Sequence, residues 1–198
     1  MPEYIMGTAA RCSDGSCGMV RRTILDPATR AVTHLVIAPR HHSAQGRLVP
    51  VDLVETTSGE IRLNCTLAEF ARFDPAEEVD LVDDVGTPSI GVPVIGLGTD
   101  AGLGYANPVI ATHAVPLGET EIERHESVHC VDGEIGQVEG FITSPADHQV
   151  THVLLKEGHL WGRRQVAIPV SAVASVDDGI RLKITKQEVE DLPPVDSA

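Results

Sequence analysis

Residues 125–129 read His-Glu-Ser-Val-His and match the H-E-x-x-H pattern of zinc proteases. That chemistry needs both histidines on one face of a helix, with the glutamate beside the metal-bound water. The segment runs directly into Asp132 and Gly133, a turn signal that leaves no room for a helix of useful length. In a strand, His125 and His129 would share a face but lie about 13 Å apart, at roughly 3.3 Å of rise per residue, which is too far to ligate one ion. The sequence therefore predicts no catalytic centre and no metal site here.

A glycine-rich stretch at 96–102, Gly-Leu-Gly-Thr-Asp-Ala-Gly, resembles a loop that binds dinucleotides. Such a loop must open a helix whose N-terminus holds the pyrophosphate. Residues 103–108, Leu-Gly-Tyr-Ala-Asn-Pro, cannot sustain a helix, and no alternation of strand and helix surrounds them. We therefore predict a flexible connector here and no cofactor.

The four cysteines are Cys12, Cys17, Cys65 and Cys130. Cys12 and Cys130 fall in runs that read as strands, so we predict buried cysteines that pack as small apolar residues. The alternative is a Cys12–Cys17 disulfide or half of a metal site. Their C-x4-C spacing differs from the tight C-x2-C of most zinc sites, and no second cysteine pair follows.

The loop at 157–164, Glu-Gly-His-Leu-Trp-Gly-Arg-Arg, contains the only tryptophan of the chain, with two arginines and two glycines. Tryptophan and arginine dominate binding hot spots because they offer a large contact area and forked hydrogen-bond donors. The alternative is that Trp161 plugs one end of a barrel while the arginines pair with acidic side chains. A second loop, at 40–47, is also basic but has no aromatic residue. The candidate partner-binding residues are His159, Trp161, Arg163, Arg164, Arg40, His41, His42 and Arg47.

The elements that must position these residues come from one unit used twice. Residues 12–37 recur at 130–155, an offset of 118, and residues 50–69 recur at 169–188 after a one-residue slip. Short apolar and β-branched runs between turn residues predict strands in both copies. Each copy ends on a capping-box pattern, which predicts a short closing helix. The two capping boxes are Thr66 to Glu69 and Thr185 to Glu188.

His34 and His152 occupy equivalent positions of the two copies, inside runs that read as buried strands. Their recurrence predicts a structural hydrogen bond that both copies share. A ligand-binding or catalytic pair is the alternative, because histidine both ligates metals and transfers protons near neutral pH.

The net charge of −14 is spread unevenly along the chain. Residues 4–73 hold 8 basic and 6 acidic side chains, residues 74–120 hold 8 acidic and no basic ones, and residues 121–198 hold 7 basic and 14 acidic ones. Such a chain would repel phosphate backbones, so we predict no nucleic-acid partner. No apolar run approaches the length that spans a bilayer, and the first residues do not form a signal peptide. We therefore expect no membrane insertion and a cytoplasmic location.

The second copy carries three motifs in order, Asp132-Gly133-Glu134-Ile135-Gly136-Gln137-Val138, Val150-Thr151-His152-Val153 and Ile168-Pro169-Val170. This order resembles the PRC-barrel family, which is named after the photosynthetic reaction centre H subunit and includes the C-terminal domain of the ribosome maturation factor RimM. The resemblance covers residues 4–73 and 121–192. It implies small β-barrels that work mostly through contacts with other proteins.

We expect an all-β protein of two tandem PRC-like small β-barrels, each closed by a short C-terminal helix. The first barrel spans 1–73, an acidic connector rich in glycine and proline spans 74–120, and the second barrel with a short tail spans 121–198. We expect little regular structure in the connector, with a strand at Ile90 to Leu97 as the alternative.

The expected function is a non-catalytic protein-binding or scaffolding module, with another protein as partner and a homodimer as an open alternative. A second hypothesis is a small-molecule or metal-binding protein, enzymatic or not, with a site between the barrels. A third is a self-associating structural protein.

Overall fold

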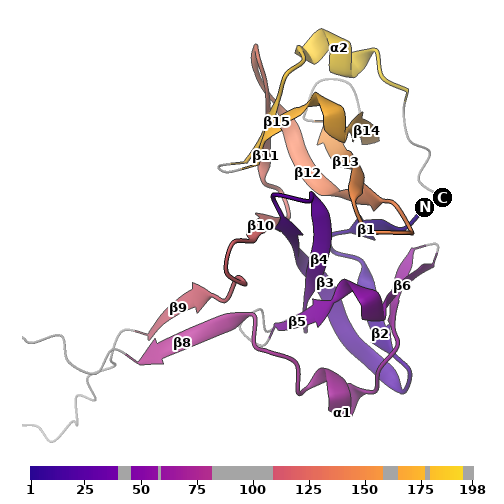
Figure 1. Ribbon diagram of the computed structural model, residues 1–198, viewed down its shortest axis with the longest axis vertical. Coiled ribbons are helices and arrows are strands. Elements are labelled where there is room, and N and C mark those ends of the chain that lie inside the picture. Colours follow the sequence, from indigo (N-terminus) through magenta and orange to yellow (C-terminus); the bar gives the residue numbers. More distant parts are fainter. Residues whose placement is uncertain (40–45, 58, 82–108, 158–164, 177–178, 194–198) are drawn as a thin grey trace, which may run out of the picture.

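The computed structural model describes residues 1–39, 46–57, 59–81, 109–157, 165–176 and 179–193 (Figure 1). Most of these residues lie in strands that form two seven-stranded sheets and a two-stranded ribbon, so the all-β prediction is confirmed. Helices in this part of the chain are short, and none is long and apolar enough to cross a membrane.

The first sheet has the strand order β5-β4-β3-β2-β7-β6. Neighbouring strands are antiparallel except β2 and β7, which run parallel. A turn of 3₁₀ helix, η2, joins β5 to β6. The elements are β2 (Ala9–Cys12), β3 (Gly15–Asp26), β4 (Ala31–Ala38), β5 (Arg47–Pro50), η2 (Val51–Leu53), β6 (Val54–Thr57) and β7 (Glu60–Leu63).

The second sheet repeats this arrangement in the order β14-β13-β12-β11-β16-β15, again with one parallel pair, β11 and β16. The two copies even share the register shifts in their long hairpins. The elements are β11 (Ser127–Cys130), β12 (Gly133–Thr143), β13 (Val150–Glu157), β14 (Gln165–Pro169), η3 (Val170–Ala172), β15 (Val173–Ser175) and β16 (Ile180–Leu182).

The seventh strand of each sheet comes from the other copy. The N-terminal strand β1 (Glu3–Ile5) pairs with β12, and the equivalent strand β10 (Thr120–Glu123) pairs with β3. The registers agree across the repeat, since Tyr4 faces Phe141 and Ile122 faces Thr23. The first strand of each repeat therefore completes the sheet of the other.

This exchange gives the two repeats one continuous core. Tyr4 and Phe141 are each 1% exposed and belong to the same apolar cluster as residues from both sheets. Two equivalent backbone hydrogen bonds join the hairpin tips, Val32 N to His148 O at 3.0 Å and Val150 N to Arg30 O at 2.8 Å. Because a unit of about 70 residues buries only a modest core alone, the shared core stabilises both repeats.

Part of the connector is regular. Strands β8 (Glu77–Leu81) and β9 (Val109–His113) form an antiparallel ribbon, which Figure 1 shows extending away from the two sheets. The expectation of little regular structure is wrong for these residues, because they pair with each other across the connector. The alternative strand at Ile90 to Leu97 lies outside the described residues.

Both predicted capping boxes are confirmed. Thr66 and Thr185 are the N-caps of helices α1 (Leu67–Phe70) and α2 (Lys186–Glu190). Their hydroxyls accept from the backbone N–H of Glu69 and Glu188. Equivalent aspartates of the Asp-Gly turns add a further cap to each helix. Asp14 accepts from Leu67 N at 2.8 Å, and Asp132 accepts from Lys186 N at 3.0 Å. The repeated Asp-Gly pair therefore ties the β2–β3 and β11–β12 turns to the closing helices.

Candidate functional site

Most of the candidate partner-binding residues lie outside the part of the chain that the structure describes. Arg47 is described, and its Nη1 donates to the carbonyl of Phe73 at 3.1 Å. This bond ties the start of β5 to the chain after α1, which is a structural role. A docking site on the two loops stays a prediction. The residues outside the described ranges are Arg40, His41, His42, His159, Trp161, Arg163 and Arg164.

The H-E-x-x-H segment is not helical, as predicted. His125 lies in the turn before β11 with a φ of +70°, and His129 lies within β11. The equivalent of His125 in the first repeat is Gly7, which also has a positive φ of +92°. In both repeats, this position therefore lies in a tight turn between two strands.

All four cysteines are buried and free, which confirms the packing prediction and leaves no Cys12–Cys17 disulfide. The sulfurs of Cys12 and Cys65 lie 3.9 Å apart in the first repeat. In the second repeat, Ile135 and Ile184 stand at the positions of Cys17 and Cys65, so these positions need apolar volume. In the described residues, no group of three or more His, Cys, Asp or Glu side chains could hold a metal ion.

Burial and the neighbouring thiols raise the pKa of Cys12 from 9.0 to about 11 and that of Cys65 to about 12. A raised folded-state pKa contributes stability that is complete below the unfolded pKa and is lost as pH rises through the folded pKa. We therefore expect the free energy of unfolding to fall between pH 9 and 12. Urea titrations of the wild type and of Cys12→Ala/Cys65→Ala would test this, with a shallower fall expected for the variant. Identical slopes would contradict the prediction.

His34 and His152 share the predicted structural hydrogen bond. Nδ1 of each ring lies 3.1 Å from the hydroxyl of the preceding threonine, Thr33 or Thr151. The Thr151 hydroxyl donates across the hairpin to the carbonyl of Ile142 at 3.0 Å. The Thr33 hydroxyl lies 3.3 Å from the carbonyl of Ile24, but its nearest acceptor is Glu119 Oε2, at 2.7 Å. Both histidine rings are half-buried.

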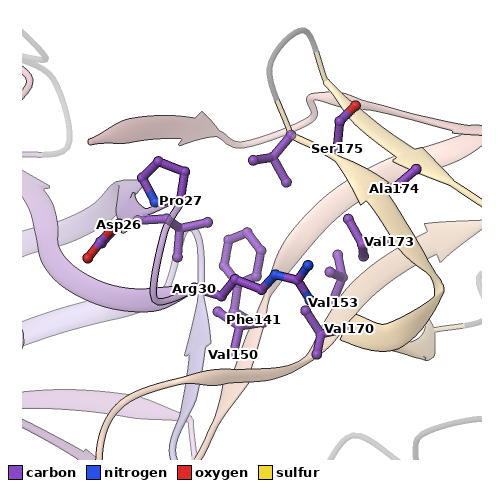
Figure 2. Close-up of a pocket in the computed structure, with 12 residues that line it drawn as sticks. Asp26, Pro27, Arg30, Phe141, Val150, Val153, Val170, Val173, Ala174 and Ser175 are labelled. Atoms are coloured by element: carbon purple, nitrogen blue, oxygen red, sulfur yellow. The ribbon is translucent and has the colours of Figure 1, made fainter. Parts of the chain in front are cut away.

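The structure places an apolar pocket where the two repeats meet (Figure 2). Its volume is about 230 Å³. One wall is the tip of the β3–β4 hairpin, and the others come from β12, β13 and the η3–β15 segment of the second repeat. The principal lining residues are Leu25, Pro27, Arg30, Phe141, Val153 and Val173. We call this cavity the junction pocket.

The hairpin tip that forms the first wall is held by its own hydrogen bonds. Asp26 Oδ1 accepts from Ala28 N at 2.8 Å, and Oδ2 accepts from the Thr29 hydroxyl at 2.8 Å. These bonds lower the pKa of Asp26, with the Thr29 hydroxyl as the largest cause. The turn ends on Arg30, whose φ of +58° is in the left-handed region. The carboxylate is engaged in the turn, and the backbone of Arg30 is fixed at the pocket mouth.

Among the described lining residues, Arg30 is the cationic group of the junction pocket, and it is exposed. Figure 2 shows its side chain extending from the hairpin tip across the space toward Val153 and Val170. Within the described residues, no carboxylate forms an ion pair with its guanidinium. An arginine in such a position presents forked donors beside an apolar surface.

The equivalent place in the first repeat is occupied by the protein itself. His148 stands where Arg30 stands in the other repeat, with a similar φ of +54°. The hydroxyl of Tyr4 lies 3.3 Å from His148 Nδ1, and Asp52 lies 3.5 Å from Nε2. The equivalent of Tyr4 is Ile122, which is shorter and has no hydroxyl to reach Arg30. His148 therefore has polar neighbours within the protein, whereas Arg30 borders the junction pocket.

Sequence reasoning missed this pocket because Asp26 to Arg30 reads only as a turn. The signal lies in the positions where the two repeats differ. The pairs Tyr4/Ile122 and Arg30/His148 each replace one chemistry with another at equivalent places. Comparing the repeats position by position would have directed attention to this junction.

No family model and no curated protein matches this chain.

Proposed function

We propose that this protein is a non-catalytic protein-binding module of two PRC-like units, and that the junction pocket accepts an apolar side chain of a partner protein. The pocket itself carries the proposal, since anchoring side chains of interfaces fill preformed apolar pockets. In proteins, an apolar cavity of about 150 Å³ can bind benzene. A volume of about 230 Å³ therefore suits one aromatic or branched aliphatic side chain.

The way the walls are built supports a binding role. They come from both repeats, which share one core and two hydrogen bonds between hairpin tips. A preformed site loses little conformational freedom when it is occupied. Among the described lining residues, the charged groups are Arg30 and Asp26, and Asp26 is engaged in the turn. This chemistry favours anchoring over proton transfer.

A pocket-filling variant tests the proposal. Ala174 lines the pocket and is exposed, so Ala174→Trp should occupy the cavity without disturbing the core. Ser171 is exposed nearby on η3, and Ser171→Trp adds the same bulk outside the lining. In affinity capture from the extract of the native cell, we expect one protein bound by the wild type and Ser171→Trp but not by Ala174→Trp. Equal capture by all three would contradict the use of this pocket.

The position of the pocket between the repeats also favours a second candidate, a small-molecule-binding protein. A cavity of this size and lining would take a compact apolar molecule. Native mass spectrometry of the purified protein would then show a bound mass that Ala174→Trp lacks. A bare protein with an intact protein partner would remove this candidate.

A further inference from the structure

We infer that the partner inserts its C-terminal residue, with an apolar side chain in the junction pocket and the α-carboxylate on Arg30. This inference rests on the proposed function and specifies the chemistry of the partner. It starts from Arg30, the one cation among the described residues that line the pocket.

Arg30 lacks an ion-pair partner in the described residues, and its side chain extends toward Val153 and Val170, which line the same pocket (Figure 2). Arg30 is exposed, and its positive charge at the edge of an apolar pocket favours a carboxylate ligand over a neutral one. Arginine binds carboxylates through two parallel hydrogen bonds, which also fixes their orientation.

The C-terminal residue of a partner provides both an apolar side chain for the pocket and a carboxylate for Arg30. In an extended segment, neighbouring side chains point to opposite faces, so an acidic residue next to the anchor would point away from Arg30. A C-terminal residue carries its carboxylate on the same Cα as its side chain, about 1.5 Å away along the Cα–C bond. The apolar group and the negative charge then reach the pocket together.

The charge of the whole protein limits the rest of the partner's tail. At a net charge of −14, the protein repels strongly acidic segments. A single terminal carboxylate on a neutral or basic tail avoids that repulsion while it uses the local cation. We therefore expect the tail to have few acidic residues.

The equivalent place at the other junction differs in its polar contacts among the described residues. There His148 already has Tyr4 and Asp52 as polar neighbours, so that place needs no external anion. The backbone of His148 has nearly the same φ as Arg30, at +54° and +58°. Histidine is therefore compatible with position 30, which supplies a matched variant.

The experiment is a chemical-shift titration of the ¹⁵N-labelled full chain with acetyl-Gly-Ser-Gly-X peptides, where X is Leu, Val or Phe. Each peptide is used as the free acid and as the amide, and acetyl-Gly-Ser-Asp-Phe-amide carries an internal acid. We expect at least one free acid to shift pocket amides and to bind about twofold to fivefold more tightly than its amide, the effect of an ion pair with an exposed arginine. Arg30→His at pH 8, where an ordinary histidine is neutral, should bind acid and amide equally.

Other outcomes overturn the inference in distinguishable ways. Equal binding of acid and amide, or binding of the internal acid as tightly as the free acid, would reject the chain end but keep the pocket as a protein site. Acid binding that survives in Ala174→Trp would place the ligand elsewhere. Failure of every peptide, with wild-type capture of a partner intact, would reject the C-terminal ligand alone. Tighter binding of octanoate than of every peptide would assign the pocket to a small apolar acid.

Discussion

Arg22→Met is expected to lower the free energy of unfolding by about 3–5 kcal/mol, the usual cost of removing one member of a buried ion pair. The Arg22 side chain is 8% exposed, and its Nε lies 2.7 Å from Glu121 Oε1. Nη2 also lies 3.8 Å from Glu77 and donates to the carbonyl of Ala76 at 3.3 Å. Both carboxylates are 11% exposed, so the variant leaves two buried negative charges without this cation. Urea denaturation at pH 7 and moderate salt measures the loss.

Arg22 joins three separate parts of the chain, since it lies on β3, Glu121 on β10 and Glu77 on β8. The control is Arg62→Met, because Arg62 is 62% exposed and lies 3.6 Å from Glu60 at the surface. Exposed pairs contribute roughly 0–1 kcal/mol, so little change is expected there. Neutralising both partners in Arg22→Met/Glu77→Gln/Glu121→Gln should recover part of the loss. A loss below about 1 kcal/mol in the single variant would show that the ion pair does not hold the strands together.

The local features of the fold could be predicted from the sequence because they depend on neighbouring residues. The capping boxes at Thr66 and Thr185, the Asp-Gly turns and the buried cysteines each follow from a few residues in a row. The exchange of β1 and β10 could not be predicted, because both possible partners, β3 and β12, derive from the same repeated sequence. A repeat pattern specifies which strands are equivalent, but not which copy each one pairs with.

The pairing of β1 with β12 depends on a difference between the copies that has no local signature. Gly140 stands at the position of Arg22 in the other repeat. Arg22 faces Glu123 of β10, whereas Gly140 faces Ile5 of β1. The first repeat uses this position for a buried charge, and the second uses it for close backbone approach. Single-sequence reasoning treats that glycine only as a weakness in a strand.

Gly140→Ala is the second large effect we expect, a loss of about 3 kcal/mol in the free energy of unfolding, at the upper end of the usual cost of overpacking. A Cβ at Gly140 would lie 2.3 Å from the carbonyl oxygen of Tyr4 and 2.8 Å from the Cα of Ile5. Both atoms belong to the backbone, so no side-chain rotation relieves the clash. The strand must move away from β12, which exposes Tyr4 and Met6, at present 1% and 2% exposed.

The Gly140→Ala substitution should first weaken the pairing of β1 with β12, before the whole protein unfolds. Met6 N donates to Glu139 O at 2.8 Å, so its amide should lose hydrogen-exchange protection in Gly140→Ala. The amides that join β10 to β3 should keep theirs, because Ile122 and Thr23 lie in the other sheet. Gly15→Ala is the control, since its Cβ would meet only the end of the flexible Leu67 side chain, at 2.9 Å. If Gly140→Ala matched this control in the free energy of unfolding and in the hydrogen-exchange protection of Met6, the pairing of β1 with β12 would not be what joins the two repeats.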